Sequence, residues 1–538
     1  MSRLAWLADK LSRRRIERET ASRLDSLSHA PVRASERTVR ALLVHLCNEP
    51  GPRVCLGETT WGEPVAVPLM EFVKACGIMT GGMGSGKTMA ACLTLEAMIA
   101  RLPHLPSMAF GVLDAKGELF DRALYLLGAR LETLEERARE ELLKRIVVID
   151  FSSREAVSPY NILARWPSAE PDFFVTSRAE TLKELLPTGE KLSLRGAEVL
   201  KHALALLSEF GLPLTYLNGL LESEPLRSKL LAQSKNPEVK LYFGRHYGQE
   251  GKQTIAALRA RMDSLLASEG VRLALAGSTA PDFKRLQNEG KITLINCAGP
   301  SITRGVRLLL QGLVLSDIRQ AIFARPNNPP VTYLWVADEA QNFFRTRQQQ
   351  EDVTDICTMG RSFGSFFCFL CQNLSTAVPD ARLLETLHTN AKWAFALRGS
   401  PRDAQFLRAA LPVTGRQPRP DSHPFRERAL YSPEEERALA LEGIAHLPDR
   451  TGYLWLKARS AEAIKIHTRR LELPEGEAFR GAVEALRENP RLGGRLSRPE
   501  YERLIDERDR EWLAPQEEPD FEARLEKRYR EERNAWQA

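Results

Sequence analysis

The stretch from Gly81 to Thr88 reads Gly-Gly-Met-Gly-Ser-Gly-Lys-Thr, which fits the phosphate-binding loop pattern Gly-x4-Gly-Lys-Thr. Glycines in such a loop let backbone N–H groups turn inward around phosphate oxygens, where a Cβ atom would clash. Lys87 can reach the β- and γ-phosphates of a nucleotide, and the Thr88 hydroxyl can bind Mg²⁺. The sequence therefore predicts that a bound nucleotide contacts Gly81, Gly82, Gly84, Ser85, Gly86, Lys87, Thr88 and Met89.

A pair of adjacent carboxylates, Asp338 and Glu339, follows the apolar run 331–337. The first can hold Mg²⁺ through water or through the coordination shell of Thr88, and the second can orient and polarise an attacking water. Acidic pairs are also common on protein surfaces. A pair that ends an apolar strand, in a chain that already holds a phosphate-binding loop, favours catalysis over a surface role.

Two further polar residues flank the strand expected at 365–371. Gln372 ends this strand, where an amide can sense a γ-phosphate; a polar residue capping a strand is the simpler interpretation. Arg361 precedes it, and a guanidinium from the same or an adjacent subunit favours phosphoryl transfer; a surface arginine is the alternative. A strand of this length spans about 23 Å, so if Gln372 touches a γ-phosphate, Arg361 can serve only a neighbour's site.

Short apolar strands alternate with helix-forming stretches on both sides of these residues. The phosphate loop lies between a strand expected at 73–79 and a helix expected at 89–99, which argues against an incidental glycine-rich turn, and the positive end of that helix points at the anion. Further strands are expected at 108–114, 146–150, 292–297, 331–337 and 392–397, with a helix at 304–323. This rhythm predicts an α/β fold with a mostly parallel, doubly wound sheet. Ligands bind at the carboxyl ends of such strands, where Lys87 and Asp114 fall.

The alternation of strands and helices is interrupted in several places, and these interruptions divide the chain into domains. Residues 53–70 look like a β-hairpin, and 452–457 with 463–467 could pair as a second hairpin. Residues 165–287 are helix-forming throughout. We expect a basic helical N-terminal segment at 1–52 and a nucleotide-binding domain in two parts, at 53–164 and 288–470. An all-helical domain is inserted between these parts at 165–287, and a charged helical tail follows at 471–538.

The two ends of the chain are rich in charge. Leu4, Leu7 and Leu11 lie on one face of an expected basic helix, which could bind a membrane surface or a partner; packing on the body or on a neighbouring subunit is the more ordinary interpretation. Residues 502–533 mix both charge signs on helical spacing, which is typical of a solvated helix or a mobile tail.

Composition places few limits on partners. The 538 residues carry a formal net charge of +6, a mild excess that permits a polyanion partner without demanding one. The eight cysteines lie mostly in apolar runs and no signal peptide is evident, so we expect reduced thiols in a cytoplasmic protein. Cys368-x2-Cys371 lies in a strand-like run, which favours core packing over zinc. No stretch approaches 18 uninterrupted apolar residues, so we expect no transmembrane helix.

Taken together, the motifs resemble those of the TraG/TraD family of type IV secretion coupling ATPases, within the HerA–FtsK superfamily of DNA-pumping motors. The matching pieces cover roughly residues 53–470: the phosphate loop, the turn Asp114-Ala115-Lys116-Gly117-Glu118, Ser158-Pro159-Tyr160-Asn161, Asp338-Glu339-Ala340-Gln341, and Gly360-Arg361-x2-Gly364 with Gln372. The Asp-x-Lys-Gly-Glu turn is the most specific of them and the phosphate loop the least.

The resemblance implies a RecA-like fold and an ATP-driven hexameric ring that moves DNA through a central pore, with Mg²⁺ bound beside the nucleotide. It suggests Glu339 as catalytic base, Gln372 as phosphate sensor and Arg361 as a trans-acting arginine finger. It also implies that the all-helical insertion helps to choose substrates and that a relaxase or a secretion-channel protein is a partner. Many family members begin with transmembrane helices; this chain shows none, so either a separate membrane partner holds it at the inner membrane or the protein is a soluble translocase.

Two other functions stay open at this point. One is a soluble HerA-like translocase that works with a nuclease in repair or defence. The other is a nucleotide-gated adaptor whose helical domain binds protein cargo, although intact Lys87, Thr88, Asp338 and Glu339 count against an inactive adaptor. ATPase activity that DNA stimulates would separate a motor from an adaptor.

Overall fold

A single large sheet runs through the part of the chain that the computed structural model describes, which is residues 34–164, 171–185, 192–378, 380–414, 417 and 430–513. Among these residues eleven strands pair in the spatial order β2, β1, β12, β11, β10, β3, β9, β8, β4, β7, β5. Their bounds in that order are Pro64–Pro68, Arg53–Thr59, Ile464–Thr468, Thr451–Leu456, Trp393–Leu397, Gly77–Thr80, Ser365–Cys371, Thr332–Ala337, Met108–Asp114, Ile292–Asn296 and Ile146–Asp150.

The sheet has a parallel half and an antiparallel half. The strands from β10 to β5 are all parallel to their neighbours, whereas the pairs from β10 to β2 are antiparallel. Every residue of β4 and β9 is buried, as expected of parallel strands covered on both faces. The α/β class with a mostly parallel, doubly wound sheet is therefore confirmed, and so are both hairpins.

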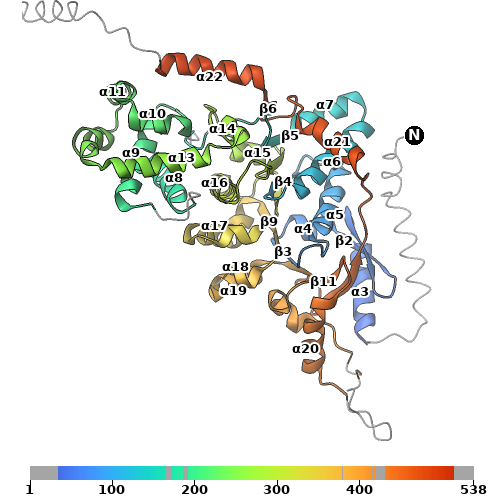
Figure 1. The fold of residues 1–538 in the computed structure, drawn as a ribbon. Helices are drawn as coiled ribbons and strands as arrows, with labels where there is room; N and C mark the ends of the chain where they lie inside the picture. The colour runs from blue at the N-terminus through green and yellow to red at the C-terminus, as the bar shows by residue number, and fades with distance from the viewer. Residues whose placement is uncertain are drawn as a thin grey trace, which may run out of the picture.

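Helices cover both faces of the parallel half (Figure 1). On one side lie α5, α6 and α7, and on the other lie α16 and α17. The bounds of the helices around the sheet are α3 Ala34–Asn48, α4 Leu69–Val73, α5 Lys87–Ile99, α6 Glu118–Thr133, α7 Glu136–Arg145, α16 Arg304–Phe323, α17 Arg347–Met359, α18 Leu374–Ala377, α19 Ala381–Asn390 and α20 Pro433–Gly443.

The strand expected at 73–79 is partly wrong. Val73 ends the short helix α4, and strand β3 begins only at Gly77. Leu69, Phe72 and Val73 are all buried on the inner side of α4. A short apolar run fits a buried helical turn as well as a strand, so hydrophobicity alone could not decide between them.

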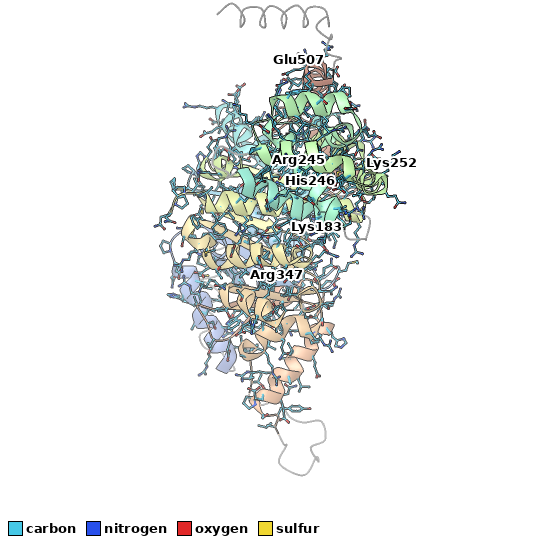
Figure 2. All side chains as sticks on the ribbon, turned by 90° about the vertical axis from the view of Figure 1, so that its left-hand side faces the viewer. Lys183, Arg245, His246, Lys252, Arg347 and Glu507 are labelled. Atoms are coloured by element: carbon cyan, nitrogen blue, oxygen red, sulfur yellow. The ribbon has the colours of Figure 1, made fainter. Side chains whose placement is uncertain are left out.

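Residues between the two parts of the sheet form an all-helical lobe, drawn in green in Figure 1. Its α-helices are α8 Pro171–Leu185, α9 Leu194–Glu209, α10 Leu217–Glu222, α11 Glu224–Gln233, α12 Pro237–Leu241, α13 Lys252–Leu265, α14 Glu269–Leu275 and α15 Phe283–Asn288. A buried ion pair between Arg178 of α8 and Asp317 of α16 ties the lobe to the core, and Tyr160 donates a hydrogen bond of 2.5 Å to the same aspartate. Figure 2 looks onto the outer face of this lobe.

The C-terminal segment runs across both parts of the molecule. Helix α21, Glu477–Arg487, packs on α6, and β13, Leu496–Ser497, pairs with β6, Ala156–Val157. Helix α22, Arg498–Leu513, then reaches the helical lobe, where the Tyr501 hydroxyl donates to the carbonyl of Leu273 at 2.6 Å. Tyr501, which is 2% exposed, anchors the start of α22, and most of the helix from residue 502 to 513 is exposed, so the expected solvated helix is confirmed there. The rest of that prediction, beyond residue 513, lies outside the described residues.

Helix α3 packs on the hairpin of β1 and β2. Its Arg40 forms an ion pair of 2.6 Å with the buried Glu63, and Arg53 donates to the carbonyl of Cys47 at 2.5 Å. The basic helix expected before residue 34 lies outside the described residues. None of the helices that the structure describes is long and apolar enough to cross a membrane.

Candidate nucleotide-hydrolysis site

The loop between β3 and α5 presents a row of unsatisfied backbone donors. Within the described residues, the N–H groups of Gly84, Gly86, Lys87 and Thr88 make no hydrogen bond. Gly86 has a φ of +98° and lies so close to Arg450 that a Cβ atom would come within 2.9 Å of the arginine Cγ. Successive free N–H groups at the positive end of a helix form a site for an oxyanion. The loop thus fits the phosphates of a nucleotide.

The ammonium of Lys87 lies inside this loop. It donates to the carbonyls of Gly81 and Gly82 at 2.6 and 2.8 Å, and its side chain is 7% exposed. Burial lowers the pKa of Lys87, while the carboxylate of Asp338 opposes that shift. A desolvated cation held only by two neutral carbonyls is well placed to bind a phosphate, which offers it a stronger partner. The sulfur of Met89, by contrast, accepts from the N–H of Leu471 at 3.3 Å and from Arg122 at 3.7 Å.

Asp338 follows the last residue of β8 and is 3% exposed. Its Oδ1 accepts the N–H of Glu339 at 2.9 Å. Burial first, and the nearby Asp114 carboxylate second, raise the pKa of Asp338 to about 7. The buried carboxylate of Asp338 gains from a nearby positive charge. Together with the half-buried hydroxyl of Thr88 on the phosphate loop, it therefore suits Mg²⁺.

Magnesium in nucleotide sites uses one or two carboxylates together with phosphate oxygens rather than a complete protein cage. The described residues hold no group of three or more His, Cys, Asp or Glu side chains arranged for a metal. The ligands Asp338 and Thr88 therefore fit a metal that arrives with the nucleotide. Asp114 has a different place: its Oδ1 and Oδ2 accept the N–H groups of Lys116 and Phe120 at 2.7 and 2.9 Å, which fixes the turn after β4.

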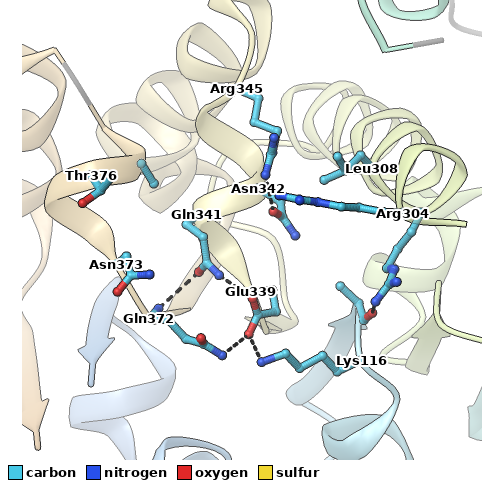
Figure 3. A pocket seen from close by; sticks show the side chains of 13 residues that line it. Lys116, Arg304, Leu308, Glu339, Gln341, Asn342, Arg345, Gln372, Asn373 and Thr376 are labelled. Atoms are coloured by element: carbon cyan, nitrogen blue, oxygen red, sulfur yellow. Dashed lines mark hydrogen bonds and ion pairs between the residues drawn. The ribbon is translucent and has the colours of Figure 1, made fainter. Parts of the chain in front are cut away.

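Glu339 is the centre of a hydrogen-bond network (Figure 3). Its backbone has a φ of +52°, a left-handed conformation that costs a non-glycine residue of order 1–3 kcal/mol. Oε1 accepts from the side-chain amide of Gln372 at 2.6 Å and pairs with the ammonium of Lys116, and Oε2 accepts from the amide of Gln341. Strained backbone at this position turns the carboxylate toward the ends of three neighbouring strands.

The sheet order brings these groups together. Strand β9 lies between β3, which leads into the phosphate loop, and β8, which leads to the carboxylate pair. Gln372 follows β9, and its own N–H donates to Oε1 of Gln341 at 3.2 Å. The structure therefore places Gln372 between Lys87 and Glu339, at the carboxyl ends of three adjacent strands.

Arg361 is not part of this cluster. It lies in η5, Gly360–Phe363, before the first residue of β9, and it is exposed to solvent. Gln372 lies at the other end of the same seven-residue strand, about 23 Å away at 3.3 Å per residue. Within one subunit Arg361 is out of reach of the site.

Sequence reasoning gave no role to two residues that contact Glu339. Lys116 comes from the turn after β4, and Gln341 from the segment after β8. Both belong to motifs that the sequence had marked, the Asp-x-Lys-Gly-Glu turn and the Asp-Glu-Ala-Gln stretch. Both motifs could thus be found in the sequence. The pairing of β4 with β8, which brings them together, could not be inferred from the motifs themselves.

No protein-family model matches the chain, and no curated protein sequence matches it. Among solved structures with a similar fold, the bacterial conjugative coupling protein TrwBdeltaN70 in complex with sulphate has 15% identity and a TM-score of 0.48, covering 82% of this chain and 94% of its own. TrwB in complex with ADP and Mg²⁺ has 14% identity and a TM-score of 0.45, covering 82% and 94%. VirB4 of Thermoanaerobacter pseudethanolicus has 14% identity and a TM-score of 0.47, covering 79% and 98%. Such likenesses assign no activity to this chain.

Proposed function

We propose that this protein is an ATPase of the coupling-protein type, which uses ATP hydrolysis to move DNA through a hexameric ring during conjugative or related type IV transfer. One observation carries the ATPase part. A phosphate loop with free N–H donors, a buried lysine and a carboxylate pair meet at the ends of adjacent parallel strands, and the amide of Gln372 contacts the carboxylate of Glu339.

In this proposal each group has a separate task. The N–H groups of the loop and Lys87 hold the β- and γ-phosphates, and Asp338 with Thr88 holds Mg²⁺, which neutralises charge that develops on the phosphate oxygens. Glu339 accepts a proton from the attacking water or orients it, provided that its carboxylate is released from its present donors. Gln372 bonds to Glu339 and follows β9, the strand beside β3 that leads into the loop, so it is placed to report whether a γ-phosphate is bound.

The ring and the DNA are the further parts of the proposal. Arg361 lies too far from its own site to act there and is exposed, which is the placement that an arginine serving a neighbouring subunit requires. The family resemblance of the motifs supports six subunits and a DNA substrate. We also propose that the protein works in the cytoplasm, and that a relaxase or a membrane protein of the secretion channel brings it to the inner membrane.

The test is steady-state ATP hydrolysis with and without DNA, measured beside the mass of the assembly. We expect turnover that needs Mg²⁺ and rises when DNA is added. Arg347→Gln provides a matched control, because this arginine is exposed on α17 and lies outside the site (Figure 2). Hydrolysis that DNA leaves unchanged, in a protein that does hydrolyse ATP, would contradict the translocase and support the adaptor.

A further inference from the structure

A pocket opens beside Glu339. Its volume is about 660 Å³. It is lined by Lys116, Arg304, Arg307, Arg345, Asn342 and Asn373, among others, and by Glu339 and Gln372 at its boundary with the site (Figure 3). No residue of the loop from Gly81 to Thr88 lines it. The pocket therefore adjoins the place where the nucleotide phosphates fit, with Glu339 and Gln372 at the boundary between them.

The three arginines of this pocket lack a carboxylate partner among the described residues. Arg307 donates to the carbonyl of Ala115 at 3.0 Å, while its Nε is buried without an acceptor. Within the described part of the chain, Arg345 reaches only the side-chain oxygen of Asn342, at 3.5 Å. The contrast with Arg319 is instructive, because that arginine, on the same helix as Arg304, pairs with both Asp352 and Asp355.

The unpaired charges also repel one another. Burial, and after it the positive charge of Arg304, lower the pKa of Arg345. The only acidic side chain in the lining is Glu339, and it is already paired with Lys116. Three arginines and one lysine thus face a single carboxylate, and an anion that enters the pocket gains from every one of them.

The same geometry restrains Glu339. Both of its carboxylate oxygens accept hydrogen bonds, from Lys116, Gln341 and Gln372. A carboxylate whose oxygens are engaged in this way has little capacity to orient a water molecule. Lys116 is the donor that the pocket can affect, because its ammonium lines the pocket and its side chain is 39% exposed.

We propose that this pocket binds phosphodiester groups of DNA, and that these groups draw Lys116 away from Glu339 and so release the carboxylate for hydrolysis. The inference rests on the proposed function, for which it supplies the link between DNA and turnover. A pocket of this size exceeds the needs of one phosphate group. The amides of Asn342 and Asn373 beside the apolar Leu308 and Ala377 suit a sugar–phosphate chain.

The first experiment removes the arginines that the phosphates would contact. The variant Arg304→Gln/Arg345→Gln is compared with Arg347→Gln/Arg382→Gln, which removes the same charge from exposed positions outside the pocket. Binding of a fluorescent single-stranded oligonucleotide is measured over a range of salt, together with ATP turnover. For the pocket variant we expect the stimulation by DNA to fall about tenfold or more, and the salt slope to weaken by about 0.7 for each lost phosphate contact.

The second experiment releases Glu339 directly. Lys116→Met keeps the length of the side chain and removes its charge. We expect turnover without DNA to rise about tenfold, in line with the loss of one charge-assisted hydrogen bond to the carboxylate, and further stimulation by DNA to shrink. A variant whose turnover without DNA stays at or below that of the unmodified protein would overturn the restraint by Lys116.

The outcomes separate the pocket from the proposed function. If DNA stimulates the unmodified protein and the pocket variant equally, the pocket assignment is wrong and the translocase stands. If DNA does not stimulate ATP turnover by the unmodified protein, the proposed translocase function is contradicted, whatever the pocket variant does. Inorganic phosphate at the same phosphate concentration should neither displace the oligonucleotide nor raise turnover; if it does either, the pocket is a site for free phosphate and the phosphodiester assignment falls.

Discussion

Replacing Arg361 by alanine tests whether neighbouring subunits complete each other's sites. Arg361 lies before the first residue of β9, and Gln372, after the last, contacts Glu339 at 2.6 Å. The strand places the two side chains about 23 Å apart, which is beyond the reach of any arginine. We expect Arg361→Ala to keep its affinity for ATP and to lose turnover by a factor of about 10³ or more, the range for arginines that contact a transferred phosphoryl group.

Mixing two inactive variants should then restore a fraction of the ATPase activity, and the geometry of the ring predicts that fraction. In a ring with head-to-tail interfaces, a site works when Lys87 is intact in one subunit and Arg361 is intact in the next. In an equal mixture of Arg361→Ala and Lys87→Ala subunits, about one interface in four meets both conditions by chance. Turnover should therefore recover toward about a quarter of the activity of the unmodified protein.

The assay is ATP hydrolysis by each variant alone and by the mixture, with exchange of subunits verified by energy transfer between labelled rings. The matched control is a mixture of Lys87→Ala with Glu339→Gln. Lys87 and Glu339 serve the same site within one subunit, so no interface in that mixture holds both and no activity should return. A mixture with Arg361→Ala that exchanges subunits and still recovers nothing would refute the trans role and leave Arg361 as a surface residue.

Four further outcomes follow from the site and the fold. Lys87→Ala should lower the rate of ATP hydrolysis by several orders of magnitude, because no other cation lies within the phosphate loop. Near-normal turnover would show that the loop is not the phosphate-binding site. Glu339→Gln should bind ATP with Mg²⁺ and hydrolyse it about 10²- to 10⁴-fold more slowly, whereas Asp338→Asn should also weaken the binding of Mg²⁺, as a titration of the metal would show. Affinity for DNA should be similar for unrelated sequences and should fall steeply with salt, which a binding isotherm at several salt concentrations checks. Arg487→Ala should lower the free energy of unfolding by about 2 kcal/mol in a denaturant titration, since it leaves the buried Asp150 without its 3.3 Å ion pair.

The sequence was enough to predict the elements that carry the chemistry. Apolar runs with polar residues at their ends identified β8 and β9, and the strand-end positions of Asp338 and Gln372 follow from those runs alone. The helix at 304–323 has the bounds that were expected. These elements are predictable because a parallel strand must be apolar throughout and can place polar groups only at its ends.

The contacts between motifs were not predictable in the same way. Lys116 and Glu339 are 223 residues apart in sequence, as their numbers show, and meet only because β4 pairs with β8. Strand order is set by packing and connection rules over the whole chain, which a single motif does not record. The C-terminal segment is a different case. Phe479, Val483 and Leu486 recur at helical spacing, so the apolar face of α21 could have been found beneath its many charges.

The C-terminal segment limits how the helical lobe can move. The lobe leaves the core before α8 and returns at β7, and a domain joined by two adjacent crossings would be free to swing about them as on a hinge. Beside the ion pair of Arg178 with Asp317, helix α22 adds a further attachment: Tyr501 bonds to Leu273, and Arg508 donates to the carbonyl of Ala276 at 2.5 Å. Swinging would require these bonds to break. Helix α22 thus braces the lobe against the core and favours movement of the two as one body.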